Sequence, residues 1–141
     1  MALTDMTFRP AAFSPHLAFV LPAHAGSVAA ARSFVRAHLT HRGCGADAQD
    51  SAALLISELF TNALRHTPSA TIGCAVHAGE RHVRIEVRGK GDGADIAPGP
   101  AETLDVRGRG LLIVQSICAA WGVQADDQGH TVWCTLPHDA P

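Results

Sequence analysis

Four segments of the 141-residue chain alternate apolar and polar side chains with the period of a β-strand. Their apolar members are Leu17, Phe19 and Leu21; Ile72, Cys74 and Val76; Val83, Ile85 and Val87; and Val132, Cys134 and Leu136. Such alternation is typical of strands that have one covered face in an antiparallel or mixed sheet. Residues 78–81 form a connection of hairpin length between the second and third segments. The sequence around Val123 allows a further short strand.

Three segments with helical spacing of apolar residues separate these strands, at residues 27–40, about 47–67 and 109–121. Asp47 is a suitable N-cap for the second helix, which must end before Pro68. Gly122 is expected to end the third. The pattern predicts a two-layer α/β sandwich, with a mixed, mostly antiparallel sheet covered on one face by about three helices. The length predicts a single domain, 1–141, with an ordered core at about 15–137.

Composition excludes several classes of function. The formal net charge of -2 gives no basic surface for nucleic acid, and no apolar run reaches the roughly 18 residues of a membrane span. Residues 1–10 lack the pattern of a signal peptide, so we expect a cytoplasmic protein. The cysteines lie far apart without a C-x-x-C pair, which argues for reduced thiols and against a zinc site.

The helix predicted at 47–67 carries a polar pair, Glu58 and Asn62, inside an otherwise apolar stretch. Residues four apart lie on one face of a helix, so the two side chains project side by side. A buried carboxylate is costly unless it is paired or coordinates a ligand, and Mg²⁺ prefers oxygen ligands of this kind. The alternative is an ordinary Glu–Arg surface pair followed by a helix-capping Asn.

Residues 89–108 are rich in glycine and proline and are expected to form a functional lid or an idle surface loop. Residues 89–94 fit a dinucleotide-binding fingerprint, but the prolines that follow prevent the helix that this fingerprint requires. The segment Gly108–Leu111 does open a helix, so its amides form a phosphate site to which Arg107 and Arg109 add charge. The alternative is a plain helix start with two exposed arginines.

Four segments occur in a characteristic order: Glu58–Thr67, which reads E-L-F-T-N-A-L-R-H-T, Gly108–Val114, Trp121–Gly122 and Thr131–Trp133. This order resembles the histidine-kinase-like ATP-binding family, which includes gyrase B, sensor kinases and anti-sigma-factor serine kinases. Within this family, the short chain and its motifs are most similar to the anti-sigma-factor serine kinase branch. The resemblance covers about residues 15–137.

The resemblance implies a Bergerat-type fold that uses ATP and Mg²⁺, and a bacterial serine/threonine protein kinase that acts in transcription regulation. Its partners would be a sigma factor and a small antagonist protein, and a homodimer is compatible with the family. Asn62 would ligate Mg²⁺, and Glu58 would be the general base. The other implied nucleotide-binding residues are His66, Gly89, Gly91, Gly93, Arg107, Gly108, Arg109, Gly110, Leu111 and Thr131.

One position departs from the family pattern. The first glycine box of the family reads D-x-G-x-G, and its Asp accepts a hydrogen bond from the adenine amino group. Gly89 stands at that position in this chain. Loss of such an acceptor costs about 1–3 kcal/mol. A second hypothesis is therefore a degenerate relative that binds a protein partner with weak or no nucleotide turnover, and a third is an unrelated α/β enzyme.

Overall fold

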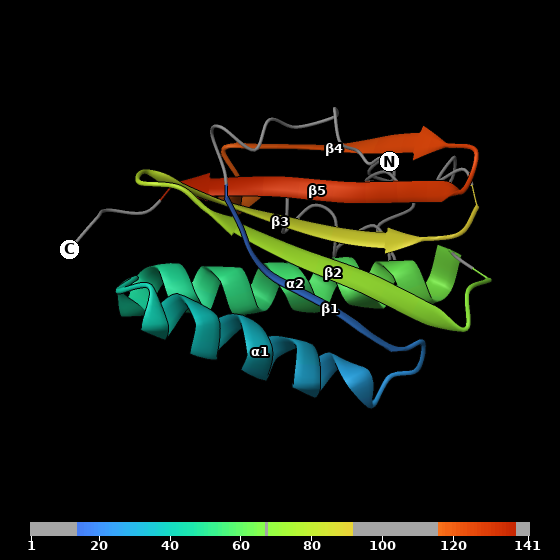
Figure 1. Cartoon of the computed structure of the whole chain (residues 1–141), viewed down its shortest axis with the longest axis horizontal. Helices are drawn as coiled ribbons and strands as arrows, with labels where there is room; N and C mark the ends of the chain where they lie inside the picture. Colours follow the sequence, from blue (N-terminus) through green and yellow to red (C-terminus); the bar gives the residue numbers. More distant parts are fainter. Residues whose placement is uncertain (1–13, 67, 92–115, 138–141) are drawn as a thin grey trace.

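A computed structural model describes residues 14–66, 68–91 and 116–137 of the chain. The elements in order are β1 (Ser14–Pro22), α1 (Ser27–His41), α2 (Ala46–His66), β2 (Thr71–Ala78), β3 (His82–Gly89), β4 (Ala120–Asp126) and β5 (Gly129–Pro137). The strands form one five-stranded sheet in the order β1-β2-β3-β5-β4. Both helices lie side by side on one face of this sheet (Figure 1). The predicted two-layer α/β sandwich is confirmed, and every strand pair in the described residues is antiparallel.

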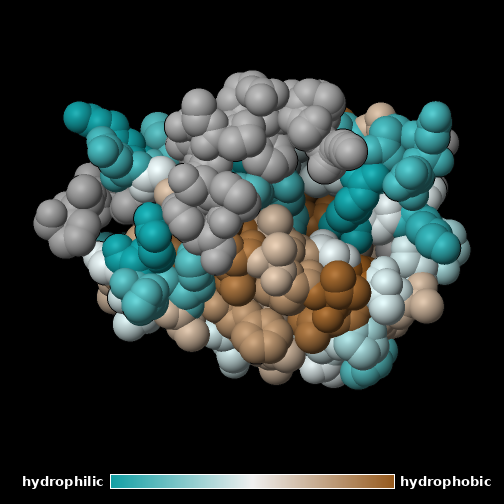
Figure 2. Space-filling model, in the orientation of Figure 1, coloured by the Kyte–Doolittle hydropathy of each residue, from teal (hydrophilic) through white to brown (hydrophobic). Residues whose placement is uncertain are grey.

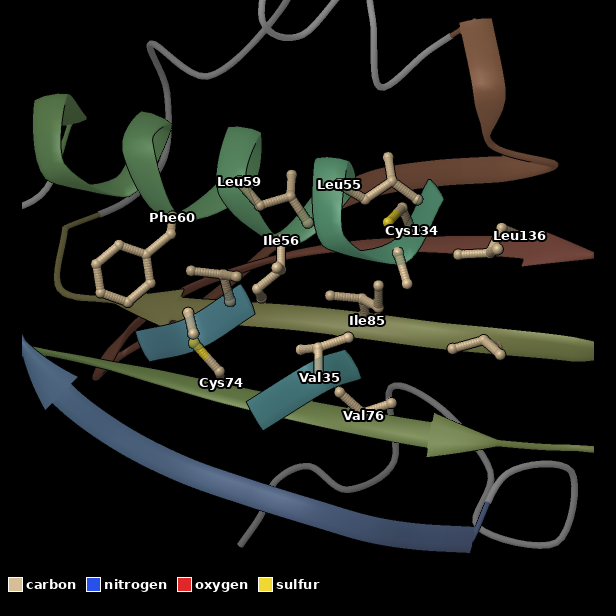
Figure 3. Close-up of a cluster of buried hydrophobic side chains, with 14 of the residues drawn as sticks. Val35, Leu55, Ile56, Leu59, Phe60, Cys74, Val76, Ile85, Cys134 and Leu136 are labelled. Carbon is tan, nitrogen blue, oxygen red and sulfur yellow. The ribbon is translucent and has the colours of Figure 1, made fainter. Parts of the chain in front are cut away.

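The core lies between the helices and the sheet because the alternating apolar side chains of the strands meet the apolar stripe of α2. Figure 3 shows Leu55, Ile56, Leu59 and Phe60 of α2 directed at the strands, with Val35 of α1 completing the cluster. The facing side chains from the sheet are Cys74, Val76, Ile85, Cys134 and Leu136. Burial of each large aliphatic or aromatic side chain contributes about 1.5–3 kcal/mol.

The predicted end of the third helix is wrong. Residues 109–115 lie outside the described residues, and helix is present only at 116–117 before β4 begins at Ala120. Trp121 and Gly122 are therefore strand residues, paired with Cys134 and Trp133 of β5. A short apolar run fits a strand as well as a helix, and pairing with β5 decided between them. The strand allowed around Val123 is confirmed as β4.

Gly122 has a packing role instead of the helix-ending role expected from the sequence. A Cβ added at this position would lie 2.9 Å from Cζ2 of Trp133. The absent side chain therefore makes room for the indole ring. That ring also stacks under the guanidinium of Arg84, whose Cζ lies 4.4 Å from the ring centroid on the face of the sheet opposite the helices.

The N-cap expected at Asp47 is also misplaced. The amide of Gln49 donates to the carbonyl oxygen of Gly45, so Gly45 is the cap and Asp47 lies in the first turn of α2. The carboxylate still benefits there from the positive end of the helix dipole. The side chain of Gln49 donates to the carbonyl oxygen of Cys44 at 2.9 Å, which ties the incoming chain to the helix start.

The surface over β1 and α1 carries an apolar patch, visible as the brown and tan area in Figure 2. Val20 of the edge strand is 66% exposed and Phe34 of α1 is 44% exposed. The Phe34 ring packs against Phe19, with ring centroids 5.0 Å apart.

Neither described helix has the long uncharged apolar stretch that a membrane crossing requires.

Candidate functional site

Glu58 and Asn62 lie on the flank of α2 that faces away from α1. Side chains turn by about 100° per residue around a helix. The flank toward α1 is marked by Ser57, whose hydroxyl oxygen accepts a hydrogen bond from Nη1 of Arg32 at 3.2 Å. Glu58 is half-buried, and Asn62, one turn further along, is only 5% exposed. The two polar groups therefore share one surface of the helix, next to the sheet.

Asn62 is buried without satisfying its amide nitrogen. Within the described residues, Nδ2 of this side chain has no hydrogen-bond partner. Asn62 also lies one turn inside α2, which ends at His66, so it is not a capping residue. Glu58 forms no ion pair within those residues either, so the structure does not support the ordinary surface-pair interpretation. An orphaned buried amide costs about 1–3 kcal/mol and indicates a group that a ligand would complete.

The end of α2 meets the turn that follows β3. A Cβ built on Gly91 would lie 3.8 Å from Cδ of Pro68 and 3.9 Å from the carbonyl oxygen of His66. Gly91 has a φ of +93°, a conformation that favours glycine. The amide of Lys90 donates to Oγ of Ser69 at 2.7 Å, which fastens the turn to the chain leaving the helix. The structure thus brings together the predicted residues at the end of α2 and after β3.

Thr131 is not part of this group. Its hydroxyl oxygen accepts a hydrogen bond from Nη1 of Arg88 at 2.8 Å, on the sheet face opposite the helices. Nη2 of Arg88 also binds both carboxylate oxygens of Asp126, at 2.9 and 2.8 Å. The hydrogen bond from Arg88, together with those from the amides of Gln128 and Gly129, lowers the pKa of the Asp126 carboxyl. This cluster fastens the β4–β5 hairpin to β3.

His130 is the residue of this region that the motif comparison missed. It pairs directly with Gly89 across the β3–β5 ladder and is 0% exposed. Its Nδ1 lies 3.1 Å from the carbonyl oxygen of Gly91, and its buried Nε2 has no partner within the described residues. The sequence could have predicted this position, because alternate residues of a strand lie on one face and residue 130 therefore shares the face of Val132 and Cys134.

Two cysteines of the core, Cys74 and Cys134, do not provide a reactive thiolate. Burial raises the pKa of the Cys74 thiol to about 12. The hydrogen bond with Cys118 and burial raise the pKa of Cys134. Because the thiolate is the nucleophilic form, these two core thiols are poor nucleophiles.

The remaining predicted nucleotide-binding residues fall outside the described residues, and their roles stay predictions. They are Gly93, Arg107, Gly108, Arg109, Gly110 and Leu111.

Comparison with known proteins places this geometry in a family. The sequence matches the family described as the histidine kinase-like ATPase domain over residues 21–136. The fold is similar to the crystal structure of the RsbU and RsbW domains of Rv1364c from Mycobacterium tuberculosis, with a TM-score of 0.63 and 22% sequence identity. That similarity covers 89% of this chain and 32% of the other, and no curated protein matches. The chain belongs to the histidine kinase-like ATPase domain family.

Proposed function

We propose that this chain binds Mg²⁺–ATP along the Glu58/Asn62 flank of α2 and phosphorylates a serine or threonine of a small antagonist protein, as an anti-sigma-factor kinase. The observation that carries the proposal is the buried Nδ2 of Asn62, one helical turn from Glu58, which has no partner within the described residues. This N–H donor suits a phosphate oxygen, which leaves the amide oxygen of the same side chain for the metal. The glycine turn after β3 lies next to the end of the same helix, α2. Membership of the ATPase family supports the nucleotide, and the RsbW-containing structure supports the regulatory class.

The donor set around Asn62 fits a magnesium ion held mainly by its nucleotide. Within the described residues, no three His, Cys, Asp or Glu side chains gather into a metal cage. Mg²⁺ commonly takes one or two protein ligands and completes its shell with phosphate oxygens and water. Asn62 would supply its amide oxygen, and the bound ion would neutralise charge on the phosphates.

Glu58 would act on the protein substrate. A carboxylate can accept the proton of an attacking hydroxyl when it lies within hydrogen-bond reach in the complex. The half-buried position of Glu58 leaves its carboxylate reachable from outside the protein, whereas Asn62 lies deeper. This difference in depth fits a base that meets an incoming side chain and an amide that holds the metal.

Calorimetric titration of the full chain with ATP, with and without Mg²⁺, tests the proposal. We expect Mg²⁺-dependent binding that Asn62→Ala weakens by at least about tenfold, the effect of losing about 1.4 kcal/mol. Glu58→Gln should keep nucleotide affinity and lose most phosphate transfer to a serine-containing antagonist protein. Ser57→Ala, on the flank toward α1, is the matched control and should change neither. No ATP binding by the wild-type chain would refute the proposal.

One observation favours a second candidate, a partner-binding relative with weak or no turnover. Gly89 cannot provide the side-chain acceptor that the resemblance assigns to the adenine amino group. If the chain binds a sigma factor with unchanged affinity in the presence and absence of ATP, and transfers no phosphate, this second function replaces the first.

A further inference from the structure

His130 lies on the helix-covered face of the sheet, at the end where β3 leads into Gly91. β5 pairs Val132 with Val87 and His130 with Gly89, and both valines belong to the buried core. Because side chains of a strand alternate between faces, the His130 ring points to the same side as Val132, the layer that contains α2. Gly91 in turn abuts the end of α2, one turn beyond Asn62.

The hydrogen bond of Nδ1 determines what the other ring nitrogen can do. A carbonyl oxygen only accepts, so Nδ1 of His130 must donate its hydrogen to the Gly91 carbonyl 3.1 Å away. In the neutral ring Nε2 then carries a lone pair and no hydrogen, which makes it an acceptor. This acceptor is buried and has no partner within the described residues.

His130 of β5 lies directly opposite Gly89 of β3, a residue that has no side-chain hydrogen-bond acceptor. Side chains directly opposite each other in an antiparallel pair have Cβ atoms about 4.5–5.5 Å apart. A side chain at position 89 would therefore stand beside the His130 ring on the same face of the sheet. Glycine at 89 has no side chain on that face, whereas the directly opposite residue, His130, carries a polar ring.

The chemistry of ATP identifies the group that can meet this acceptor. Its phosphates carry no donors, so the donors on the nucleotide are the ribose hydroxyls and the exocyclic amine of the base. A deeply buried acceptor beside apolar Val87 and Val132 suits the flat base better than the hydrated sugar. The proposed function assigns the phosphates to the flank of α2 at Asn62, which leaves the acceptor of His130 for the base.

We propose that Nε2 of His130 accepts a hydrogen bond from the exocyclic amine of adenine, supplying from β5 the acceptor that Gly89 on β3 cannot. The inference rests on the proposed ATP-binding function and adds the residue that recognises the base. It makes His130 a specificity-determining residue of that site.

Wild-type protein alone provides the first test. Calorimetry compares ATP with purine riboside 5′-triphosphate, which lacks the exocyclic amine and is otherwise the same ligand. A buried acceptor left without its donor predicts a preference for ATP of about 5- to 150-fold. Equal affinity for the two nucleotides would overturn the inference without any variant being made.

Variants then assign the preference to the residue. His130→Phe keeps a planar ring without an acceptor, and it should bind the two nucleotides equally. His130→Gln can place an amide oxygen near the Nε2 position and should keep part of the preference. His82→Phe is the matched control, because this exposed histidine lies at the opposite end of β3, paired with Pro137. Far-UV circular dichroism and thermal melting establish that each variant is folded.

The outcomes separate this inference from the function on which it rests. ATP binding with a preference that His130→Phe removes and His82→Phe keeps supports the assignment. ATP binding with a preference that survives in His130→Phe overturns the assignment and leaves the nucleotide function standing. A wild-type chain that binds no ATP overturns both.

Discussion

Replacing Asn62 with alanine should stabilise the unliganded protein while weakening its binding of Mg²⁺–ATP. The wild-type amide is 5% exposed and its Nδ2 has no partner within the described residues. Removing a buried unsatisfied group recovers about 1–3 kcal/mol. Alanine also has a higher helix propensity than asparagine, by about 0.6 kcal/mol in a helix interior. The lost packing of the side chain offsets these gains by about 1 kcal/mol.

The net expectation is a rise of about 1–2 kcal/mol in the free energy of unfolding, which for a domain of this size raises Tm by roughly 3–8 °C. Guanidinium denaturation and thermal melting of the nucleotide-free protein measure the two quantities. Ser57→Ala on the same helix is the control. Its hydroxyl donates to the carbonyl oxygen of Ala53 at 2.8 Å and accepts from Arg32, so the lost hydrogen bonds should cancel the propensity gain.

A fall of 1 kcal/mol or more in Asn62→Ala would refute this reasoning. It would mean that the amide is satisfied inside the fold and stabilises the helix–sheet interface, as an ordinary buried asparagine does. An increase of the same size in both Asn62→Ala and Ser57→Ala would mean that helix propensity alone accounts for the effect.

Three further outcomes are expected. Asp126→Asn should lower stability at neutral pH and make thermal melting temperature less sensitive to acid. The folded protein has a lowered Asp126 pKa, so the carboxylate stabilises the fold above its unfolded-state pKa, and this stabilisation is lost as pH falls through its folded-state pKa. Unchanged acid sensitivity in the variant would count against the Arg88 pair. Gly129→Ala should destabilise by about 1–3 kcal/mol, because its Cβ would overlap the backbone carbonyl oxygen of Gly89, and a wild-type denaturation curve would contradict this. Phe60→Ala, at a fully buried position, should cost about 3–5 kcal/mol in guanidinium denaturation, with a loss under 1 kcal/mol contradicting its core role.

Local periodicity was enough to predict most of the fold. The strand residues around Val83 and Val132 and the helix containing Glu58 and Asn62 lie where their spacing placed them. The segment before β5 could not be predicted in the same way. Trp121 and Val123 fit either period over so short a run, and only their pairing with Cys134 and Val132 of β5 selects the strand.

The site was predictable on the helix and less so on the strands. Glu58 and Asn62 share a flank because their separation of four residues is a local property of any helix. Thr131 was assigned from a motif, which gives a position in the sequence but not a face of the sheet. An offset of one residue in a strand moves a side chain to the other face, so Thr131 lies with Arg88 while His130 faces α2.

Nδ2 of Asn62 and Nε2 of His130 are both buried without a partner in the part of the chain that the structure describes, and both lie at the end of the helix–sheet interface near Gly91. At the opposite end of β3 and β5, Val83 pairs with Leu136 and both side chains are buried, so polar groups are not a general requirement of this core. Each unsatisfied nitrogen lowers stability by about 1–3 kcal/mol, a cost that apolar side chains would avoid. The presence of both nitrogens near Gly91 fits the proposed nucleotide site, because preorganised polar groups stay unpaired until a ligand provides their partners.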